Sequence, residues 1–424
     1  MEETNIKVIF EDFFTYRKGA FYVEDTGVKD IASRYKTPSY VYSMNYLLSQ
    51  VKKFKAAFAG ADSLICYSVK ANSNLKLLEM MQKEGYGADV VSEGELRGAL
   101  IAGFPPEKIV FAGVGKKEEE IELGIKKKIY CFNIENEEEL AYAEKYGKKY
   151  KREVICNLRL NLDIDVDTHH YVKTSKKETK FGLDLEKAEY LLKNRGKHKY
   201  ARIKGFHLHL GSQLKEVSPY MKALEAVEDF SKKTGFRPEI IDIGGGFGIA
   251  YSPGDRVAGI SDFGGKITGA VREMGIKKLI LEPGRFITGN TAVLLTEVLY
   301  VKKRGGKTFV IVDAAMNDLI RPALYGSRHI ILPVSKKPAA GGMVRADIVG
   351  PICETGDYLG KDVDVPSGIK KGDLLVIGSA GAYSFSMSSN YNSRLKPCEL
   401  LVDGKKISVI RKRESYRCLW ERDG

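Results

Sequence analysis

The sequence is poor in cysteine and has no closely spaced pair of cysteines. Its six cysteines are scattered, and no two of them are separated by only two residues. This spacing argues against structural zinc and against a disulfide framework, and it fits a reducing compartment. The six are Cys66, Cys131, Cys156, Cys353, Cys398 and Cys418.

Long apolar runs are also missing. The longest ones, such as AVLLTEVLYV (292–301), are too short and too often interrupted by polar residues to cross a bilayer. The first residues, MEETNIKVIF, begin acidic and lack the features of a signal peptide. We therefore expect a soluble cytoplasmic protein that does not contact a membrane.

Charge of one sign does not gather in blocks. The chain carries 68 basic and 55 acidic residues, a net charge of +13, but the two signs alternate in stretches such as KKEEE (116–120). Interleaved charge is typical of a solvated surface with many ion pairs and disfavours a nucleic-acid partner. The positive balance is suited to attracting a small anionic substrate.

What the sequence does contain is a repeated alternation of short apolar runs with helical patterns between residues 39 and 285. About eight such alternations predict a parallel (β/α)8 barrel, with an open doubly wound sheet as the alternative. Residues 286–424 read as strands between glycine- and proline-rich turns, a second β-rich domain that the strands of residues 1–38 join. The apolar runs of the barrel are 64–69, 87–91, 108–112, 128–132, 154–160, 202–210, 239–243 and 278–282.

Reactive side chains or glycines stand at the carboxyl ends of these predicted strands, where barrel enzymes carry their active sites. They are Lys70, Asp89, the segment His209–Ser212, the glycines 244–246 and the segment Glu282–Arg285.

The glycine triplet 244–246 suggests a backbone cradle for phosphate, because glycine lets amide groups approach an anion closely. A dinucleotide fingerprint is the rival interpretation. It fails because Ile249 stands where the third glycine belongs and because the motif comes late in the chain. His207 and His209, two apart on a predicted strand, face the same side, but no third ligand lies nearby, so we expect no metal.

A lysine, a phosphate cradle, a histidine facing a ring and a carboxylate together indicate pyridoxal 5′-phosphate. This cofactor needs a lysine amine, a phosphate site and an acidic partner for its pyridine nitrogen. Lys70 and Glu282 are suited to the first and the last of these roles.

The chain resembles the diaminopimelate decarboxylase family of the fold-type III, alanine-racemase-like group. The resemblance covers residues 10 to 420 and rests on eight motifs in the family's order. They are YSVKAN, GADVVSEGEL, HLHLGSQ, DIGGGFG, EPGRF, DAAMNDLIRPALYG, GPICETGD and GAYSFSMSSNYNSR.

The resemblance implies roles around the cofactor. Lys70 is the lysine that binds pyridoxal phosphate, supported by Asp89, and His209 stacks on the ring. Glu282 pairs with the pyridine nitrogen. The phosphate is implied to be held by Ser212, Gly244, Gly245, Gly246 and Tyr383.

The resemblance also implies a substrate, meso-diaminopimelate, which is decarboxylated at its D-configured centre to L-lysine. Arg285, Arg321 and Tyr325 bind the distal carboxylate, with Arg321 and Tyr325 on one face of a turn or short helix. Tyr383 is implied to contact the substrate as well as the phosphate. Glu354 recognises the distal amine. Cys353 and Glu354 reach into the partner's active site, which implies a homodimer with shared sites, and Cys353 or Lys70 donates the proton to the substrate.

Two departures from the family pattern are visible, at Asn161-Leu162-Asp163, where proline is common, and at Thr291-Ala292. Neither removes a chemical role. A related decarboxylase of ornithine, arginine, carboxynorspermidine or a D-amino acid is the alternative, but most of those substrates lack the distal carboxylate. A non-catalytic protein that binds pyridoxal phosphate is the other alternative, although such relatives lack the β-domain. Racemase chemistry is disfavoured, because it uses arginine at the pyridine nitrogen.

Overall fold

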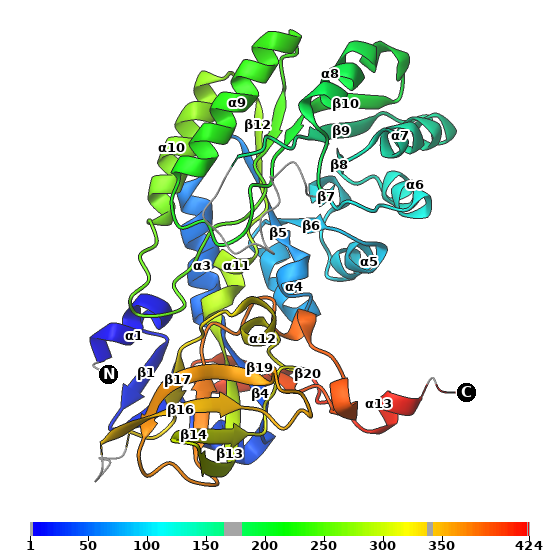
Figure 1. Cartoon of the computed structure of the whole chain (residues 1–424). Coiled ribbons are helices and arrows are strands. Elements are labelled where there is room, and N and C mark those ends of the chain that lie inside the picture. The colour runs from blue at the N-terminus through cyan, green and yellow to red at the C-terminus, as the bar shows by residue number, and fades with distance from the viewer. Residues whose placement is uncertain (1–2, 165–179, 337–341, 422, 424) are drawn as a thin grey trace. The chain divides into compact units, whose positions relative to one another are not determined.

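A computed structural model describes residues 3–164, 180–336, 342–421 and 423 (Figure 1). The chain divides into two compact units. The barrel unit comprises residues 51–248 and 257–284, and the β unit comprises residues 1–50, 249–256 and 285–424. The predicted fold class, a (β/α)8 barrel with a separate β-rich part, is confirmed.

Eight parallel strands close the barrel in the order β10-β11-β12-β5-β6-β7-β8-β9. All eight were predicted, and six of them have bounds within one residue of the prediction at each end. The two larger differences are at β8, which begins three residues later and ends two residues later, and at β10, which ends at His207 rather than at Leu210. The strands are β5 (Ser63–Ser68), β6 (Gly87–Val90), β7 (Ile109–Phe111), β8 (Cys131–Ile134), β9 (Val154–Arg159), β10 (Ala201–His207), β11 (Ile240–Asp242) and β12 (Lys278–Leu281).

Helices alternate with these strands, and most begin at a polar cap. The side chains of Asn74, Ser92, Asn136 and Asp184 accept hydrogen bonds from backbone amides of the first helical turn, as the capping pattern requires. The boundary between the two units in the sequence, after residue 50, falls within the first of these helices. The helices are α3 (Met44–Ala57), α4 (Leu75–Lys83), α5 (Glu93–Ile101), α6 (Glu118–Lys127), α7 (Glu137–Lys149), α8 (Leu185–Asn194), α9 (Ser218–Thr234) and α10 (Ile260–Glu273).

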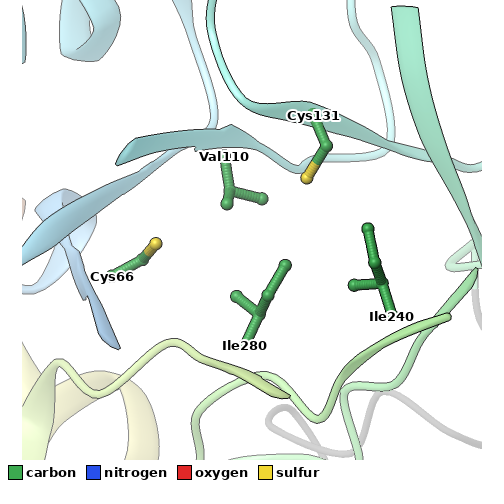
Figure 2. Packing of buried hydrophobic residues seen from close by; sticks show 5 residues of the cluster. All are labelled: Cys66, Val110, Cys131, Ile240 and Ile280. Atoms are coloured by element: carbon green, nitrogen blue, oxygen red, sulfur yellow. The ribbon is translucent and has the colours of Figure 1, made fainter. Parts of the chain in front are cut away.

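The barrel interior is filled by side chains rather than by solvent. Cys66, Val110, Cys131, Ile240 and Ile280 come from five strands, are buried and point toward a common centre (Figure 2). Burial raises the pKa of the Cys66 and Cys131 thiols well above its usual value, so these cysteines behave as small apolar groups. The apolar layer supports the polar groups at the carboxyl ends of the strands.

The β unit is built on a nine-stranded sheet with the main order β17-β16-β14-β13-β4-β19-β20. Beside this path, β18 pairs with β13 and with β15. The strands are β4 (Ser39–Ser43), β13 (Ala292–Arg304), β14 (Lys307–Val312), β15 (Ile331–Pro333), β16 (Met343–Val349), β17 (Tyr358–Pro366), β18 (Leu374–Ile377), β19 (Cys398–Asp403) and β20 (Lys406–Arg411).

The first residues form a small sheet of their own, β1 (Phe14–Arg17), β2 (Ala20–Val23) and β3 (Thr26–Gly27), between α1 (Glu3–Phe10) and α2 (Val28–Tyr35). This sheet attaches to the β unit through a bridge between Ala20 and Ser335. Although β4 lies in the range predicted for the barrel, it pairs with β13 and β19. The predicted boundaries of the three segments stay a prediction.

Short helices complete the two units. They are α11 (Arg285–Thr288), α12 (Arg321–Tyr325) and α13 (Arg417–Trp420), with 3-10 turns η1 (Val69–Ala71), η2 (Pro106–Lys108), η4 (Arg195–Lys197), η5 (Gly289–Thr291), η6 (Phe385–Met387) and η7 (Tyr391–Ser393). Among the described residues, no helix combines the length and the apolar character that a membrane crossing requires.

Candidate active site

Lys70 lies on η1, directly after β5, and its amine contacts a buried carboxylate. The Lys70 Nζ is 2.7 Å from Asp89 Oδ2, and the Ser68 hydroxyl donates to the same oxygen at 2.6 Å. The Lys70 side chain is 33% exposed, whereas Asp89 is fully buried. The strand register places Ser68 opposite Asp89, so this arrangement follows from the pairing of β5 with β6.

Burial, together with the nearby Glu282, raises the pKa of Asp89 above its ordinary value, although Lys70 and Ser68 act in the opposite direction. A carboxyl group with a raised pKa accepts a proton more readily than an ordinary aspartate. Lys70 therefore has a neighbour to which its ammonium proton can pass, and the neutral amine is the nucleophilic form.

A cavity of about 380 Å³ opens at this end of the barrel. It is lined by Lys70, His207, His209 and Glu282, together with Arg159 and Phe181. The Arg159 guanidinium lies 4.7 Å from the centre of the Phe181 ring. Charged groups, imidazoles and one aromatic ring thus surround a space that is suited to a planar charged molecule.

Glu282, directly after β12, belongs to a buried network. Its Oε2 lies 3.6 Å from His207 Nε2, and its Oε1 is 3.3 Å from the Asn133 amide nitrogen. The same Asn133 nitrogen donates to Asp242 Oδ2 at 2.8 Å, and the Gly244 amide donates to Asp242 Oδ1 at 2.9 Å. One asparagine therefore connects two buried carboxyl groups.

The two carboxyl groups have opposite proton preferences. Burial and the adjacent Glu282 raise the pKa of Asp242 well above its usual value. Burial also opposes ionisation of Glu282, but His207 and Lys70 outweigh it and hold the pKa of Glu282 below its usual range. We conclude that Glu282 is the ionised member and Asp242 the protonated one, since two close carboxylates do not both ionise at low cost.

His207, Asp242 and Glu282 place ligand atoms within 4.8 Å of one another, a spacing that a metal ion also uses. The Asn133 amide already occupies an oxygen of each carboxyl group. The expectation of no metal stays a prediction.

The glycine triplet after β11 forms a tight loop. Gly244 and Gly246 have positive φ angles of 68° and 95°, a backbone conformation that glycine adopts without strain. A Cβ on Gly246 would lie 2.5 Å from the Gly211 carbonyl oxygen, and one on Gly244 would lie 2.5 Å from the Leu208 carbonyl oxygen. Only glycine fits this close approach, and such loops present backbone amides to a phosphate. The loop therefore fits a phosphorylated cofactor.

His209 and Ser212 lie after β10, so the prediction that the strand continues through His209 is wrong. The Leu208 amide still donates to the Asp242 carbonyl of β11 at 2.7 Å. The segment after it packs against the glycine loop, where the Leu214 amide donates to the Gly246 carbonyl at 2.8 Å. Burial, and then Arg159 and Lys70, hold the pKa of His209 well below its usual value. A neutral imidazole that lines the cavity is suited to stacking on a ring.

The β unit holds a second polar cluster. The guanidiniums of Arg285 and Arg321, 8% and 6% exposed, both donate to the Tyr251 hydroxyl, Arg321 at 2.6 Å. The Arg285 guanidinium also lies 4.8 Å from the ring centre of Tyr383, a residue with a positive φ of 55°. Arg321 and Tyr325 are the first and last residues of α12, as the predicted short helix requires. Two buried cations on one oxygen form a receptor suited to a carboxylate.

Cys353 and Glu354 are exposed and are not part of either cluster in this chain. Their loop is held by Asp357, whose carboxylate accepts hydrogen bonds from the Met316 and Ile352 amides at 2.7 and 2.8 Å. The Cys353 amide donates to Asn392 Oδ1 at 2.7 Å. Both side chains are exposed on this loop, and Glu354 Oε1 accepts from the Gly356 amide at 3.2 Å.

Sequence reasoning missed several polar residues that the structure brings to these clusters. Asn133, Arg159 and Asp242 stand at or near the ends of barrel strands, so their positions alone were a usable signal. Tyr251 gave no local signal, because Arg285 and Arg321 are 34 and 70 residues away in the chain. His329 is eight residues from Arg321, but the carbonyl of Gly378, which fixes its tautomer, is 49 residues away.

Comparisons with known proteins agree with this geometry. Residues 44–289 match the family model described as "Pyridoxal-dependent decarboxylase, pyridoxal binding domain". The chain is 42% identical to the diaminopimelate decarboxylase of Aquifex aeolicus over 96% of both chains.

Solved structures give the same result. Diaminopimelate decarboxylase from Helicobacter pylori, complexed with L-lysine, superposes with a TM-score of 0.88 at 38% identity, covering 93% of this chain and 99% of that one. The enzyme from M. jannaschii, also with L-lysine, gives a TM-score of 0.91 at 33% identity, covering 97% and 98%. With its lysine, its ionised glutamate and its glycine loop at the carboxyl ends of barrel strands, the chain belongs to the diaminopimelate decarboxylase family of pyridoxal-dependent decarboxylases.

Proposed function

We propose that the protein decarboxylates meso-diaminopimelate to L-lysine and carbon dioxide, the last step of lysine biosynthesis, with pyridoxal 5′-phosphate as cofactor. The observation that carries the choice of substrate is the pair of buried guanidiniums on Tyr251. An amino-acid decarboxylase needs such a pair only if its substrate keeps a second carboxylate, as diaminopimelate does and ornithine and arginine do not.

The barrel unit supplies the cofactor site. Lys70 binds the cofactor, and Gly244, Gly245 and Gly246 with Ser212 offer donors for its phosphate, as we propose also for Tyr383. His209, which lines the cavity, would stack on the cofactor ring. When bound, pyridoxal phosphate supplies the electron sink for the bond that breaks at the substrate's α-carbon.

The residues of the chain control protons around that sink. Glu282 stays ionised and holds a proton on the pyridine nitrogen, helped by Asn133 and by the protonated Asp242. Asp89 takes and returns the proton of Lys70. Because the carbon-carbon bond breaks with loss of carbon dioxide, one proton must reach the α-carbon, and Lys70 or Cys353 donates it.

The distal end of the substrate is recognised separately. Arg285, Arg321 and Tyr325 bind its carboxylate. The distal amine is bound by Glu354, which in this proposal comes from the partner subunit together with Cys353. The exposure of both side chains on an anchored loop supports this role. The functional form is then a cytoplasmic homodimer.

Product analysis tests the proposal. Purified protein with pyridoxal phosphate is offered meso-diaminopimelate, ornithine, arginine and lysine in separate reactions, and amines and carbon dioxide are measured. We expect L-lysine from diaminopimelate and little product from the others. Turnover of ornithine or arginine instead would identify a related decarboxylase, and no turnover of any substrate would leave a protein that only binds the cofactor.

A further inference from the structure

The hydroxyl of Tyr251 accepts two hydrogen bonds, which leaves the acceptor of its own hydrogen to be identified. A guanidinium has only N–H donors and no acceptor, so the phenol oxygen must be the acceptor toward both Arg285 and Arg321. A phenol oxygen has room for two such hydrogen bonds. Its own hydrogen cannot point to either arginine and is directed to a third partner.

The ring that carries this hydroxyl is held rigidly. Tyr251 is 8% exposed, and its backbone amide donates to Asp255 Oδ2 at 2.9 Å. Its ring meets the His329 ring edge-on, with centres 5.0 Å apart, and the Arg321 guanidinium lies 4.8 Å from its centre. The position of the hydroxyl is therefore set before any ligand arrives.

His329 orients the guanidinium of Arg321. Its Nδ1 is 2.8 Å from the Gly378 carbonyl oxygen, and a carbonyl only accepts, so Nδ1 carries the hydrogen. Its Nε2 is consequently an acceptor and faces Arg321 at 3.3 Å. Burial, and then Arg321, lower the pKa of His329 to about 3, which keeps the ring neutral.

Arg321 is thus held from several sides. One terminal nitrogen is shared between Tyr251 and His329, and the other donates to the Ser327 hydroxyl at 3.3 Å. Among the described residues Arg321 has no ion pair with a carboxylate. A buried cation that is oriented by neutral groups alone keeps its charge available for an incoming anion.

We propose that Tyr251 is a specificity-determining residue whose hydroxyl hydrogen donates to the distal carboxylate of the substrate, and that His329 is a positioning residue that orients Arg321 for the same carboxylate. This inference rests on the proposed function, because it assigns the third donor of the same carboxylate site. Loss of one hydrogen bond to a charged group predicts weaker binding by about 10- to 100-fold.

L-lysine and cadaverine are a matched pair of probes, since they differ only by the carboxylate that the site is proposed to hold. Their dissociation constants are measured by calorimetry on the pyridoxal phosphate-loaded enzyme. Tyr251→Phe removes this donor and also the oxygen that accepts from the two guanidiniums. We therefore expect L-lysine to bind at least about 10- to 100-fold more weakly and cadaverine to bind unchanged. With diaminopimelate, the loss should appear mainly in KM.

Tyr46→Phe is the control, because it removes another buried hydroxyl of the β unit, which donates to the Ile9 carbonyl at 2.7 Å. It should leave the preference for L-lysine over cadaverine intact. The inference would be wrong if Tyr251→Phe preserved the preference, either by leaving both ligands unchanged or by weakening both equally, and equal weakening would mean a structural role. A wild-type enzyme without any preference for L-lysine would instead contradict the proposed carboxylate site itself.

The positioning role of His329 has its own test. His329→Gln retains a side-chain acceptor and a donor, whereas His329→Leu has neither. We expect the glutamine variant to keep most of the preference for L-lysine and the leucine variant to lose about 10-fold of it. Equal behaviour of two folded variants would overturn this role.

Discussion

The reactivity of Lys70 depends on its neighbour more than on its exposure. A lysine in water keeps its proton at neutral pH, but Lys70 lies 2.7 Å from a buried carboxyl group with a raised pKa. Lys76, six residues later, pairs with the exposed Glu79 on the surface of α4. The two lysines therefore differ in chemistry although they share one short stretch of sequence.

This difference predicts different outcomes for two matched substitutions. Lys70→Ala should abolish the visible absorbance of bound cofactor and lower turnover of diaminopimelate by at least ~10³-fold, because Lys70 is the one lysine among the described residues that line the cavity. Lys76→Ala should change neither. Absorbance spectra and product formation check both. A Lys70→Ala enzyme with normal absorbance would assign the cofactor to another lysine.

His329 predicts a pH dependence of stability. Its pKa is about 3 in the folded protein against 6.5 for an ordinary histidine. A depressed pKa stabilises the fold fully above about pH 6.5, and this contribution is lost as the pH falls toward 3. Between pH 7.5 and 5 the loss is about 2 kcal/mol.

His329→Gln should lack this dependence, so the difference in free energy of unfolding between wild type and variant should shrink by that amount at pH 5. Urea unfolding at the two pH values measures it. A difference that stays constant with pH would mean that His329 does not titrate in this way. The groups around the ring are Arg321, Tyr251 and, further away, Arg285.

Among the structural elements, the glycine loop after β11 predicts how a substitution changes the affinity for the cofactor. Gly246→Ala would force a side chain onto a backbone with φ of 95° and place its Cβ 2.5 Å from the Gly211 oxygen. The loop must shift, and we expect affinity for pyridoxal phosphate to fall by about 10-fold or more. The cofactor dissociation constant, measured by fluorescence titration, checks this.

Gly269→Ala is the control, since Gly269 lies in α10 with nothing within 4 Å of an added Cβ. This change should stabilise the helix by about 0.5–1 kcal/mol and leave cofactor affinity unchanged. Equal affinities for the two alanine variants would argue against a phosphate role for the loop.

The elements of the barrel were predictable because their signal is local. Apolar runs alternate with capped helices, and reactive groups or glycines stand at or near the ends of five strands, β5, β6, β10, β11 and β12. The errors arose where tertiary contacts override that signal, as at His209, where the chain leaves the ladder to meet the glycine loop. Strands β15, β16 and β17 were not identified individually. The hydrogen bonds of Tyr251 with Arg285 and Arg321, and that of His329 with Gly378, join segments that no local pattern connects.

At the scale of the whole molecule, the exposed loop with Cys353 and Glu354 predicts complementation between subunits. In a homodimer with shared sites, each site combines Lys70 of one subunit with the partner subunit's Glu354. Lys70→Ala and Glu354→Ala should each be nearly inactive alone. Mixed at equal amounts, half of the randomly formed dimers are mixed and have one intact site of two, so about a quarter of wild-type activity should return.

A matched mixture separates this result from simple mutual stabilisation. Lys70 and Glu282 both lie at strand ends of one barrel, so no mixed dimer of Lys70→Ala with Glu282→Ala contains an intact site. That mixture should stay inactive. Differently tagged subunits, recovered together, establish that exchange has occurred. If exchange is complete and the first mixture also stays inactive, Glu354 acts within its own subunit or not at all, and the shared site is wrong.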